Sequence, residues 1–441
     1  MSGTQTDRVP GPEALGPRLA RLRRDPIGML TDLTREYGDV VRFKFGLEHV
    51  HFLNHPDLIR EVLVTSSGKF HKGPGFQDLR RVMGDGLFTS EAPLHHRQRR
   101  LAQPAMHHSR VSAYADVMAR IAESRAARWR DGERLRVDAE MSALTLAIVG
   151  KALFDVDFEE EDGRRVREAI TVVLELFNRQ RPAAVHAATD AFQGAMDELD
   201  AIIYGLIREH RAGPDRGDFL SMLLMARDED AGSADGGMSD QQLRDEAITL
   251  VLAGHETTAL ALTWTLYSLT LFPDVEEELH REVDAVLGGR TPTYGDLASL
   301  TFTRMTFAEG IRMFPPVWAI DRRLLVDHEI GGHLLPAGSV VWLCPYVTQH
   351  DPRWWPEPER FDPLRLLPEA EAARPKYAYF PFSAGPRLCY GEPFAWMEGT
   401  LVLATIASRW RFDLAPGHPV EMLPIGTLRQ RHGMAMDVHA R

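Results

Sequence analysis

Apolar positions recur at helical spacing through the middle of the chain, and this spacing predicts a mainly helical protein. From about 97 to 272 they follow a period of three to four residues, broken by polar stretches at 211–218 and 228–237. The stretch Ser239-Asp-Gln-Gln242 has the form of a capping box, and no proline follows it until Pro273. We therefore expect one helix of about 30 residues, roughly 45 Å long, that crosses the molecule.

The remaining pattern predicts shorter elements on both sides of this helix. Helical spacing is found at 28–37, at 56–65, at 275–287, in a run that ends near Met313, and from Gly391 to about Trp410. Alternating or apolar strand-like runs are found at 39–46, 49–54, 323–330 and 339–345, and a short hairpin is expected at 422–439. An extended lead-in is expected at 1–24 and a coil rich in proline, tryptophan and charge at 351–376.

These elements predict a mainly α fold with small β-sheets. We expect one domain over 25–441 after the lead-in. Within this domain, strands predominate at about 30–70, 315–345 and 423–441, and helices predominate at about 95–313 and 391–410.

Composition narrows the classes of protein that the chain can belong to. The 441 residues carry a formal net charge of -12, which argues against nucleic acid as a general partner. Two cysteines indicate a reducing compartment, and neither a signal peptide nor a membrane-length apolar run is seen. We expect a monomeric cytoplasmic protein without a membrane anchor.

Cys389 is the residue with the most distinctive surroundings. It lies in a glycine-containing loop directly before a predicted helix, where backbone N–H groups and the positive helix end favour a thiolate. Such a thiolate can be a nucleophile, a redox sensor or a metal ligand. Cys344, by contrast, lies in an apolar strand-like run and is interpreted as an inert core thiol.

Three motifs resemble those of the cytochrome P450 family, and their order along the chain is the one found in that family. The segment Phe382-x-x-Gly385-x-Arg387-x-Cys389-x-Gly391, continuing to Ala395 and Glu398, is similar to the haem-binding signature. Upstream, Glu309-Gly-Ile-Arg312 with Pro358-Glu-Arg360-Phe361 resembles the E-x-x-R motif and the segment that completes it, and Ala253-Gly-His-Glu-Thr-Thr258 resembles the oxygen-activation motif of a long central helix.

The resemblance implies the fold of that family, with haem b between the long central helix and the helix after the cysteine loop. Cys389 would be the iron ligand, because a thiolate on haem iron favours O–O cleavage. The resemblance also implies cofactor-binding residues, namely His95, Arg99, Arg322, Phe382, Gly385, Arg387, Cys389 and Gly391. The cations among them suit the haem propionates.

By the same resemblance, Glu256 and Thr257 form an acid–alcohol pair that delivers protons during oxygen activation. The Thr257 hydroxyl can instead bond back to a carbonyl three or four residues earlier. His255 is expected to face away from the haem. Glu309, Arg312 and Arg360 are expected to form a structural triad, in which Glu309 and Arg312 share a helix face.

Substrate-pocket candidates follow from position in the family, and most are apolar, which favours a hydrophobic substrate. They are Phe76, Phe88, Leu174, Phe177, Ala247, Leu250, Val251, Ala253, Val317, Ile320, Ile425 and Gly426. Each is equally compatible with plain core packing. The sequence does not choose among terpenes, polyketides and fatty-acid-like substrates.

The reaction implied is monooxygenation, that is hydroxylation or epoxidation, in bacterial secondary metabolism. Electrons would come from NAD(P)H through a ferredoxin or flavodoxin with its reductase, and Arg97, Arg100 and Arg387 are candidate docking residues. The alternatives are a peroxide-using haem-thiolate enzyme or an isomerase, and a non-catalytic haem or ligand-binding protein such as a gas sensor. The retained Glu256 and Thr257 count against the peroxide-using enzyme.

Overall fold

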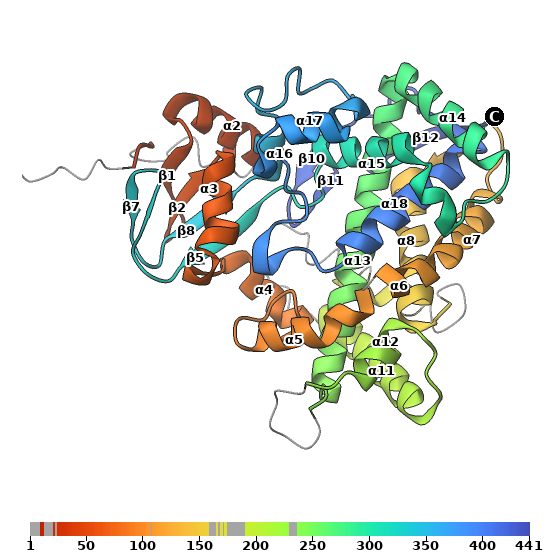
Figure 1. Ribbon diagram of the computed structural model, residues 1–441, viewed down its shortest axis with the longest axis horizontal. Helices are drawn as coiled ribbons and strands as arrows, with labels where there is room; N and C mark the ends of the chain where they lie inside the picture. Colours follow the sequence, from red (N-terminus) through yellow and green to blue (C-terminus); the bar gives the residue numbers. More distant parts are fainter. Residues whose placement is uncertain are drawn as a thin grey trace, which may run out of the picture. The chain divides into compact units, whose positions relative to one another are not determined.

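The computed structural model describes residues 9–12, 21–22, 24–106, 108–157, 165, 168–170, 172–173, 190–228 and 236–441. The chain forms two compact units, each built from two separate stretches of sequence. The first consists of residues 1–77 and 309–389, and the second of residues 78–308 and 390–441. Figure 1 shows the elements of both units.

The first unit is organised around a five-stranded sheet in the order β1-β2-β8-β5-β3. Strand β2 pairs with β8 in parallel, and the other neighbours are antiparallel. A two-stranded ribbon of β6 and β7 is separate from it. The strands are β1 (Val40–Phe45), β2 (Glu48–Leu53), β3 (Phe70–Lys72), β5 (Ile320–Leu324), β6 (His328–Ile330), β7 (His333–Leu335) and β8 (Val340–Leu343).

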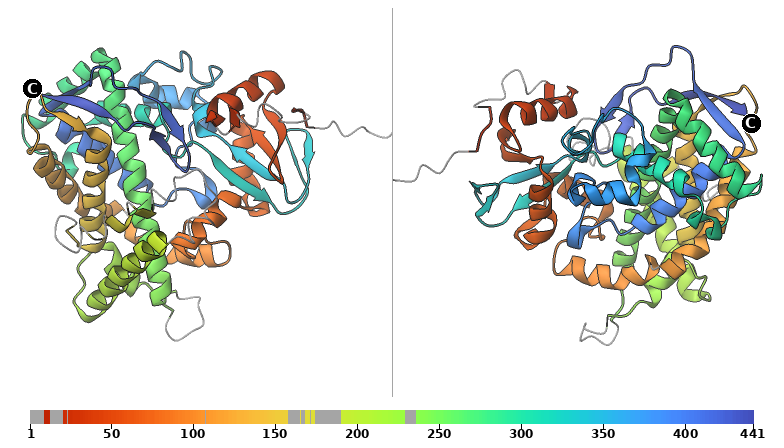
Figure 2. Two further views of the ribbon diagram at one scale, coloured as in Figure 1. Left: turned by 180° about the vertical axis from the view of Figure 1, so that it is seen from behind. Right: turned by 45° about the horizontal axis from the view of Figure 1, so that its top comes forward.

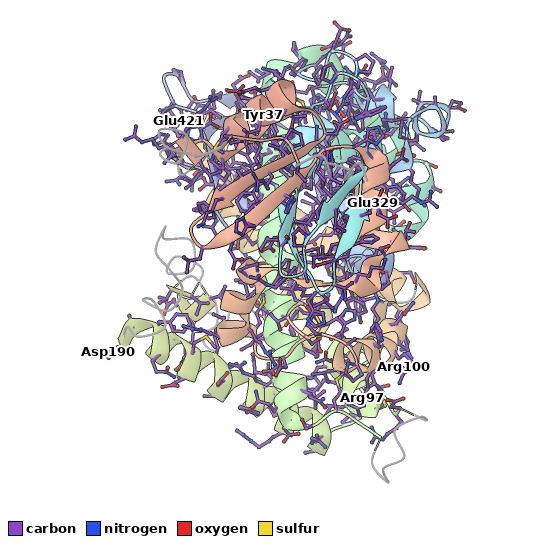
Figure 3. The ribbon with its side chains drawn as sticks, turned by 90° about the vertical axis from the view of Figure 1, so that its left-hand side faces the viewer. Tyr37, Arg97, Arg100, Asp190, Glu329 and Glu421 are labelled. Atoms are coloured by element: carbon purple, nitrogen blue, oxygen red, sulfur yellow. The ribbon has the colours of Figure 1, made fainter. Side chains whose placement is uncertain are left out.

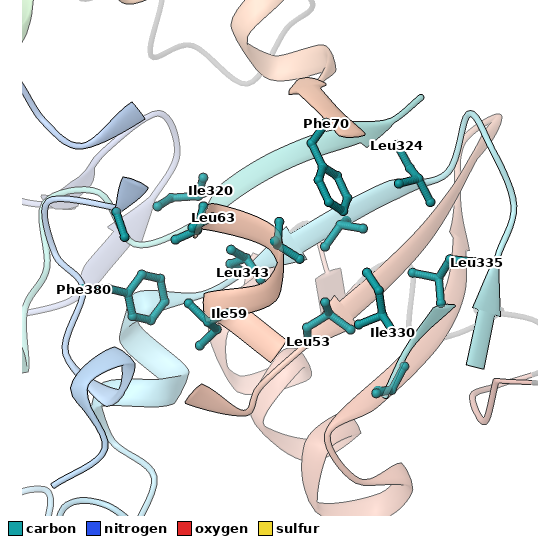
Figure 4. Packing of buried hydrophobic residues seen from close by; sticks show 14 of the residues in the cluster. Leu53, Ile59, Leu63, Phe70, Ile320, Leu324, Ile330, Leu335, Leu343 and Phe380 are labelled. Carbon is teal, nitrogen blue, oxygen red and sulfur yellow. The ribbon is translucent and has the colours of Figure 1, made fainter. Parts of the chain in front are cut away.

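Short helices accompany this sheet, and Figure 4 shows the core packed between the sheet, α3 and the segment around Phe380. That core contains buried Leu53, Ile59, Leu63 and Leu343. The helices are α2 (Pro26–Tyr37), α3 (Pro56–Arg60), the π-helical η1 (Glu61–Thr65), η2 (Ser67–Lys69), α16 (Pro345–Gln349), η6 (Pro363–Leu366), α17 (Pro368–Ala373), η7 (Lys376–Ala378) and η8 (Gly385–Arg387).

The second unit is mainly helical. Two small sheets belong to it, β4-β12-β9 and β10-β11, formed by β4 (Arg134–Arg136), β9 (Trp410–Leu414), β10 (Met422–Pro424), β11 (Leu428–Gln430) and β12 (Ala435–Ala440). Its helices are α5 (Leu94–Ala102), η3 (Gln103–Met106), α6 (His108–Val111), η4 (Ser112–Tyr114), α7 (Ala115–Ala126), α8 (Val137–Phe154), α11 (Asp190–Ala212), α12 (Phe219–Met225), α13 (Asp240–Leu271), α14 (Pro273–Leu287), η5 (Tyr294–Ala298) and α18 (Glu392–Ala407). Helices α4 (Pro74–Met83) and α15 (Thr301–Met313) extend over the unit boundaries.

Helix α13 is the central element of the second unit, and α8 packs along it (Figures 1 and 2). It has 32 residues and begins with the predicted capping box, in which Gln242 N donates to Ser239 Oγ at 3.2 Å and Ser239 N donates to Gln242 Oε1 at 3.1 Å. It ends at Leu271 because Pro273 opens the next helix. Most of its residues are buried, so it carries little amphipathic contrast.

The sequence pattern predicted most elements and misplaced several ends. Arg21, Leu22 and Arg24 are helical rather than extended, and the expected coil contains α17. The strand expected at 323–330 is two strands, β5 and β6. The predicted C-terminal hairpin is β10-β11 alone, because β12 pairs with β9 and β4 instead. Strand β9 was not predicted: the last helix was expected to end near Trp410, and no element was assigned to the residues that follow.

Among the residues that the structure describes, no helix combines the length and the apolar character that a bilayer crossing requires.

Candidate functional site

The Cys389 loop is fixed by its own backbone. Cys389 N donates to Phe382 O at 2.9 Å, which closes the loop just before α18. Gly385 has a φ of 65°, and a Cβ there would overlap the Leu63 carbonyl of η1, so only glycine permits this close approach. Ser383 also adopts a positive φ, 63°, which is uncommon for a residue with a side chain.

The two cysteines are in opposite environments. Cys344 is fully buried, its Sγ–H donates to Trp318 O at 3.0 Å, and burial raises the pKa of its thiol to about 12. Cys389 is exposed and lies immediately before Gly391, the N-cap of α18. A Cβ at Gly391 would meet nothing within 4 Å. The chain therefore presents Cys389, with open space beside the loop, as its accessible sulfur ligand.

Two cationic side chains of the first unit lie in register on neighbouring strands. Lys72 of β3 pairs with Arg322 of β5, and both are buried, with exposures of 8% and 6%. The Lys72 ammonium lies 5.9 Å and the Arg322 guanidinium 5.8 Å from the centre of the Phe76 ring. Like charges so placed repel each other, and a carboxylate beside them relieves that repulsion. The pair fits the propionates of a haem. The sequence predicted Arg322 as a propionate ligand and Phe76 as a pocket residue, and it did not single out Lys72.

Glu309 and Arg312 form a fully buried bidentate ion pair on α15. Arg312 Nε donates to Glu309 Oε2 at 2.7 Å and its Nη2 donates to Oε1 at 2.9 Å. Arg312 also donates to the carbonyls of Gln349 and Pro358, each at 2.8 Å. Burial raises the pKa of Glu309, and the Arg312 charge and hydrogen bonds oppose that rise. The guanidinium thus joins three segments of the first unit.

The structure differs from the prediction at the third member of the expected triad, Arg360. The Arg360 side chain is exposed, and only its carbonyl accepts from Arg312, at 3.3 Å. Arg365 instead brings the second guanidinium, with its Nε 3.7 Å from Glu309 Oε1. The spacing of the Pro358–Phe361 segment could not reveal this, because η6 turns the chain and returns Arg365 toward Glu309.

One side of α13 is less buried than the rest of the helix. Leu250, Ala253, Gly254, Glu256 and Thr257 are half-buried, whereas most of the surrounding positions are buried. At about 100° per residue, Leu250, Ala253 and Thr257 share one stripe. Thr257 Oγ1 donates to Ala253 O at 2.8 Å, the first of the two arrangements expected for this hydroxyl. The stripe is therefore the more accessible side of this part of α13.

The Glu256 carboxylate is held by the terminal hairpin. Thr427 Oγ1 donates to Glu256 Oε1 at 2.7 Å, and Arg429 donates from Nε at 2.7 Å and from Nη2 to the same oxygen. The Glu256 side chain is 11% exposed. Neither Thr427 nor Arg429 was identified as a partner of Glu256 from the sequence, because β11 lies some 170 positions away and only tertiary structure brings it here.

The opposite side of α13 faces α8 and α11. His255 is buried there, its Nδ1 lies 2.7 Å from Val251 O, and burial lowers its pKa. His255 thus lies on the side of α13 opposite Thr257, and its orientation relative to the haem remains a prediction. Val251 is a correction: it lines an apolar cavity of about 30 Å³ with Leu199, Ile203 and other side chains of α8, α11 and α13. It lies about 120° around the helix from Thr257 and is core on the far side.

Gly254 is explained by helix packing. A Cβ at this position would lie 3.3 Å from Val149 Cγ2 of α8, tighter than most real contacts. Glycine at this position therefore lets α8 approach α13 closely.

Helix α5 carries His95 and Arg99 one turn apart, so the two side chains share a helix face. His95 is buried at 3% exposure and Arg99 is half-buried. Arg99 acts electrostatically on Tyr390, the residue after Cys389, whose hydroxyl donates to Ala102 O. Both side chains are therefore on the element that anchors the end of the cysteine loop within the second unit.

Arg97 and Arg100 are engaged within the chain. Arg97 Nε lies 3.2 Å and Arg100 Nη2 3.1 Å from the carboxylate of Asp228, which is 5% exposed. Arg97 also donates to the carbonyls of Gly236, at 3.1 Å, and Gly237, at 2.8 Å. Figure 3 shows the two arginines close together. Their shared acidic partner weakens them as docking charges for another protein.

The other pocket candidates fall into different environments. Phe88 is 37% exposed, and Ala247 is buried. Ile320 belongs to the core of the first unit and Val317 packs against it, as the core-packing alternative predicted. In the turn between β10 and β11, Ile425 is half-buried and Gly426 is exposed. Leu174 and Phe177 lie outside the described residues.

Comparison with known proteins matches residues 13–434 to the family model "Cytochrome P450". Among curated relatives, "Cyclooctatin synthase" of Streptomyces melanosporofaciens is 38% identical, covering 94% of this chain and 92% of the relative. "Cyclooctat-9-en-7-ol 5-monooxygenase" of the same organism is 34% identical over 94% of this chain and 90% of the relative. "Pentalenene oxygenase" of Streptomyces avermitilis is 33% identical over 100% of this chain and 98% of the relative.

A solved structure agrees with these relatives. The crystal structure of the cytochrome P450DA heme domain has a TM-score of 0.89 and 26% identity, and covers 98% of both chains.

Proposed function

The chain belongs to the cytochrome P450 family, and from that premise we propose that it hydroxylates or epoxidises a terpenoid. It is a monooxygenase whose cofactor is haem b. The observation that carries the site assignment is the exposed Cys389 thiol in a loop closed onto Phe382, beside a buried and inert Cys344. The terpenoid class is supported by the printed names of the three bacterial relatives.

We assign the cofactor contacts to this chain's own residues. Cys389 would hold the iron, Gly391 leaves room for the macrocycle beside the loop, and Gly385 lets the loop pack against the Leu63 carbonyl. Arg322, Lys72, His95, Arg99 and Arg387 would bind the propionates as cations. When bound, the thiolate-ligated haem supplies the chemistry of reductive O–O cleavage.

Oxygen activation also requires protons at the side of α13 that carries Thr257. Thr257 donates its hydroxyl hydrogen to Ala253 O, so its oxygen lone pairs remain available to a water or a second donor. Glu256 is one residue away and has one carboxylate oxygen held by Arg429 and Thr427. We propose that Glu256 passes protons from solvent to the Thr257 hydroxyl.

Electrons would reach the enzyme from NAD(P)H through a ferredoxin or flavodoxin with its reductase, in the cytoplasm. Arg97 and Arg100 share Asp228, which weakens them as contacts for an acidic partner, and Arg387 is assigned above to a propionate. We propose a monomer.

The substrate class is tested by spectral titration of the holoenzyme with cyclic terpenes, terpene alcohols, fatty acids and polyketides. A shift of the haem to high spin by terpenoids, followed by oxygenated product with a ferredoxin system, is the expected result. Binding and turnover confined to fatty acids or polyketides would overturn the terpenoid assignment. Equal turnover with hydrogen peroxide alone would favour a peroxide-using enzyme.

The proton role is tested by Thr257→Ala. Because general acid–base groups contribute about a hundredfold or more, we expect the product formed per NAD(P)H to fall by at least about tenfold, with hydrogen peroxide released. Product and peroxide are measured against NAD(P)H consumption. Thr270→Ala, on the same helix and bonded to Tyr267 O, is the matched control. Unchanged coupling in Thr257→Ala would contradict the role.

A further inference from the structure

Three consecutive charged residues near the start of α13 are buried. Arg244, Asp245 and Glu246 have exposures of 7%, 4% and 2%. Burying charge is costly unless each group is paired or hydrogen-bonded. Arg244 Nε donates to Asp200 of α11 at 2.6 Å, and its Nη1 donates to Asp245 at 3.0 Å. The chain thus retains three buried charged side chains whose burial is unfavourable, and this indicates that they have a function at this place.

The two carboxylates accept backbone amides from the loop formed by residues 84–90, which precedes α5. Asp85 N donates to Asp245 Oδ2 at 2.9 Å, and Leu87 N donates to Glu246 Oε2 at 3.1 Å. Amide groups two residues apart are therefore bonded to two successive side chains of α13. The loop before α5 lies beside the N-terminal half of α13 in Figure 1.

The loop is also braced from its other side. Thr89 Oγ1 lies 2.6 Å from Gly84 O and 3.1 Å from Gly86 O, and so crosses the base of the loop. Ser90 Oγ donates to Gln98 Oε1 of α5 at 2.6 Å, and Gln98 Nε2 donates to Asp85 O. The loop therefore has a defined shape before it meets α13.

Glycines permit this contact. Gly84 has a φ of 60°, and a Cβ there would overlap the Asp245 carboxylate. A Cβ at Gly86 would overlap Thr249 Oγ1 and lie 2.7 Å from Asp245 O. Two glycines that flank Asp85 thus let the loop backbone lie directly on α13, where any other residue would displace it.

The position of Glu246 on α13 connects the loop to the reaction. Glu246 and Thr257 are separated by about three helical turns, so they lie on the same side of the helix, roughly 16 Å apart along its axis. Leu250 and Ala253, half-buried, lie between them on the same stripe. The loop therefore closes one end of the side of α13 that is open to a ligand.

We propose that Asp245 and Glu246 are positioning residues that hold loop 84–90 against α13 as the far wall of the substrate pocket. The wall limits how far a terpenoid extends from Thr257 and so sets the largest substrate accepted. This inference rests on the proposed function, because it takes the Thr257 side of α13 as the pocket.

The test uses the holoenzyme and its Glu246→Ala and Gly86→Ala variants. Hydrogen exchange followed by mass spectrometry reports on peptides that cover 84–90. Because a hydrogen bond to a carboxylate is lost or the loop is displaced, we expect exchange there to accelerate by about tenfold or more, with exchange in α8 and α18 unchanged. Glu246→Gln keeps an acceptor oxygen and should restore slow exchange.

The size limit is read from azole binding to the haem iron. The quantity measured is the association rate of clotrimazole divided by that of imidazole. We expect this ratio to rise by about tenfold in Glu246→Ala and Gly86→Ala. Gly194→Ala in α11, whose new Cβ would meet nothing within 4 Å, should keep the wild-type ratio.

Normal exchange at 84–90 in both loop variants, or an unchanged azole ratio despite faster exchange, would overturn the proposed wall. Failure of the proposed function is distinguished from this result, because it would appear in the unaltered enzyme as the absence of a terpenoid-induced spin shift and of oxygenated product.

Discussion

At the scale of single residues, the site depends on how a few charged groups are held. Glu256 illustrates this, because the sequence motif identifies the acid but not the groups that orient it. In the structure one of its oxygens accepts from both Thr427 and Arg429. A carboxylate so bound has a fixed direction, and its second oxygen is the one left to exchange protons. Arg429 is therefore inferred to be a positioning residue for proton delivery.

Arg429→Gln tests that role. Removal of the cation should let the Glu256 carboxylate reorient, and we expect product per NAD(P)H to fall several-fold, by at most about the tenfold expected of Thr257→Ala. Arg429→Lys keeps the charge and should recover most of the coupling. The solvent deuterium isotope effect on product formation should rise in Arg429→Gln only. Full coupling in Arg429→Gln, together with loss in Glu256→Gln, would show that the ion pair is dispensable.

At the scale of elements, helix ends are fixed by side chains that a local pattern only partly reveals. The capping box of α13 could be read from four residues, because it is local. The N-cap of α12 shows the other case. Asp218 Oδ1 accepts from Ser221 N at 2.7 Å, and its Oδ2 lies 2.8 Å from Nε2 of His210 on α11. This buried contact joins two helices.

The contact between His210 and Asp218 predicts that the stability of the folded protein depends on pH. Burial lowers the His210 pKa, but the hydrogen bond and charge of Asp218 outweigh it, so the pKa is raised above 6.5. Burial raises the Asp218 pKa, but bonds from His210 and Ser221 leave it below 3.8. The Asp218 contribution is therefore lost as pH falls below 3.8, and the His210 contribution is lost as pH rises through its raised pKa.

We accordingly expect His210→Gln to lower the free energy of unfolding by about 3 kcal/mol near pH 5.5 and by clearly less near pH 9. Urea unfolding of the holoenzyme at both pH values measures this difference. His439→Gln, at a half-buried site near Asp413, serves as the control and should have a small effect. An equal loss for His210→Gln at pH 5.5 and pH 9 would show that the imidazolium is not the stabilising form.

At the scale of the whole molecule, the sequence identified the family and most elements because its motifs are local. The Cys389 loop, the Glu309–Arg312 pair and the Ala253–Thr258 stretch each lie within ten residues. What it could not predict depends on distant segments. Arg365 replaces Arg360 at Glu309, Lys72 joins Arg322 across β3 and β5, and Asp228 pairs with Arg97 and Arg100.

The same reasoning explains the error at Val251. Its position in the central helix suggested a pocket residue, yet the side that it occupies is set by where α8 and α11 pack. Burial around α13 separates the two sides, and the stripe through Leu250, Ala253 and Thr257 is half-buried, together with the neighbouring Gly254 and Glu256. Periodicity gives the faces of a buried helix, whereas tertiary packing decides which face meets the ligand.

The assignment of Cys389 as the haem ligand is tested most directly by the carbon monoxide difference spectrum of the reduced holoprotein. The wild-type enzyme should show the long-wavelength Soret band of thiolate ligation, and Cys389→Ser should abolish it. Cys344→Ser should leave the band in place, because that thiol is buried and bonded to Trp318 O. A wild-type spectrum without the band, or a band that survives in Cys389→Ser, would contradict the assignment.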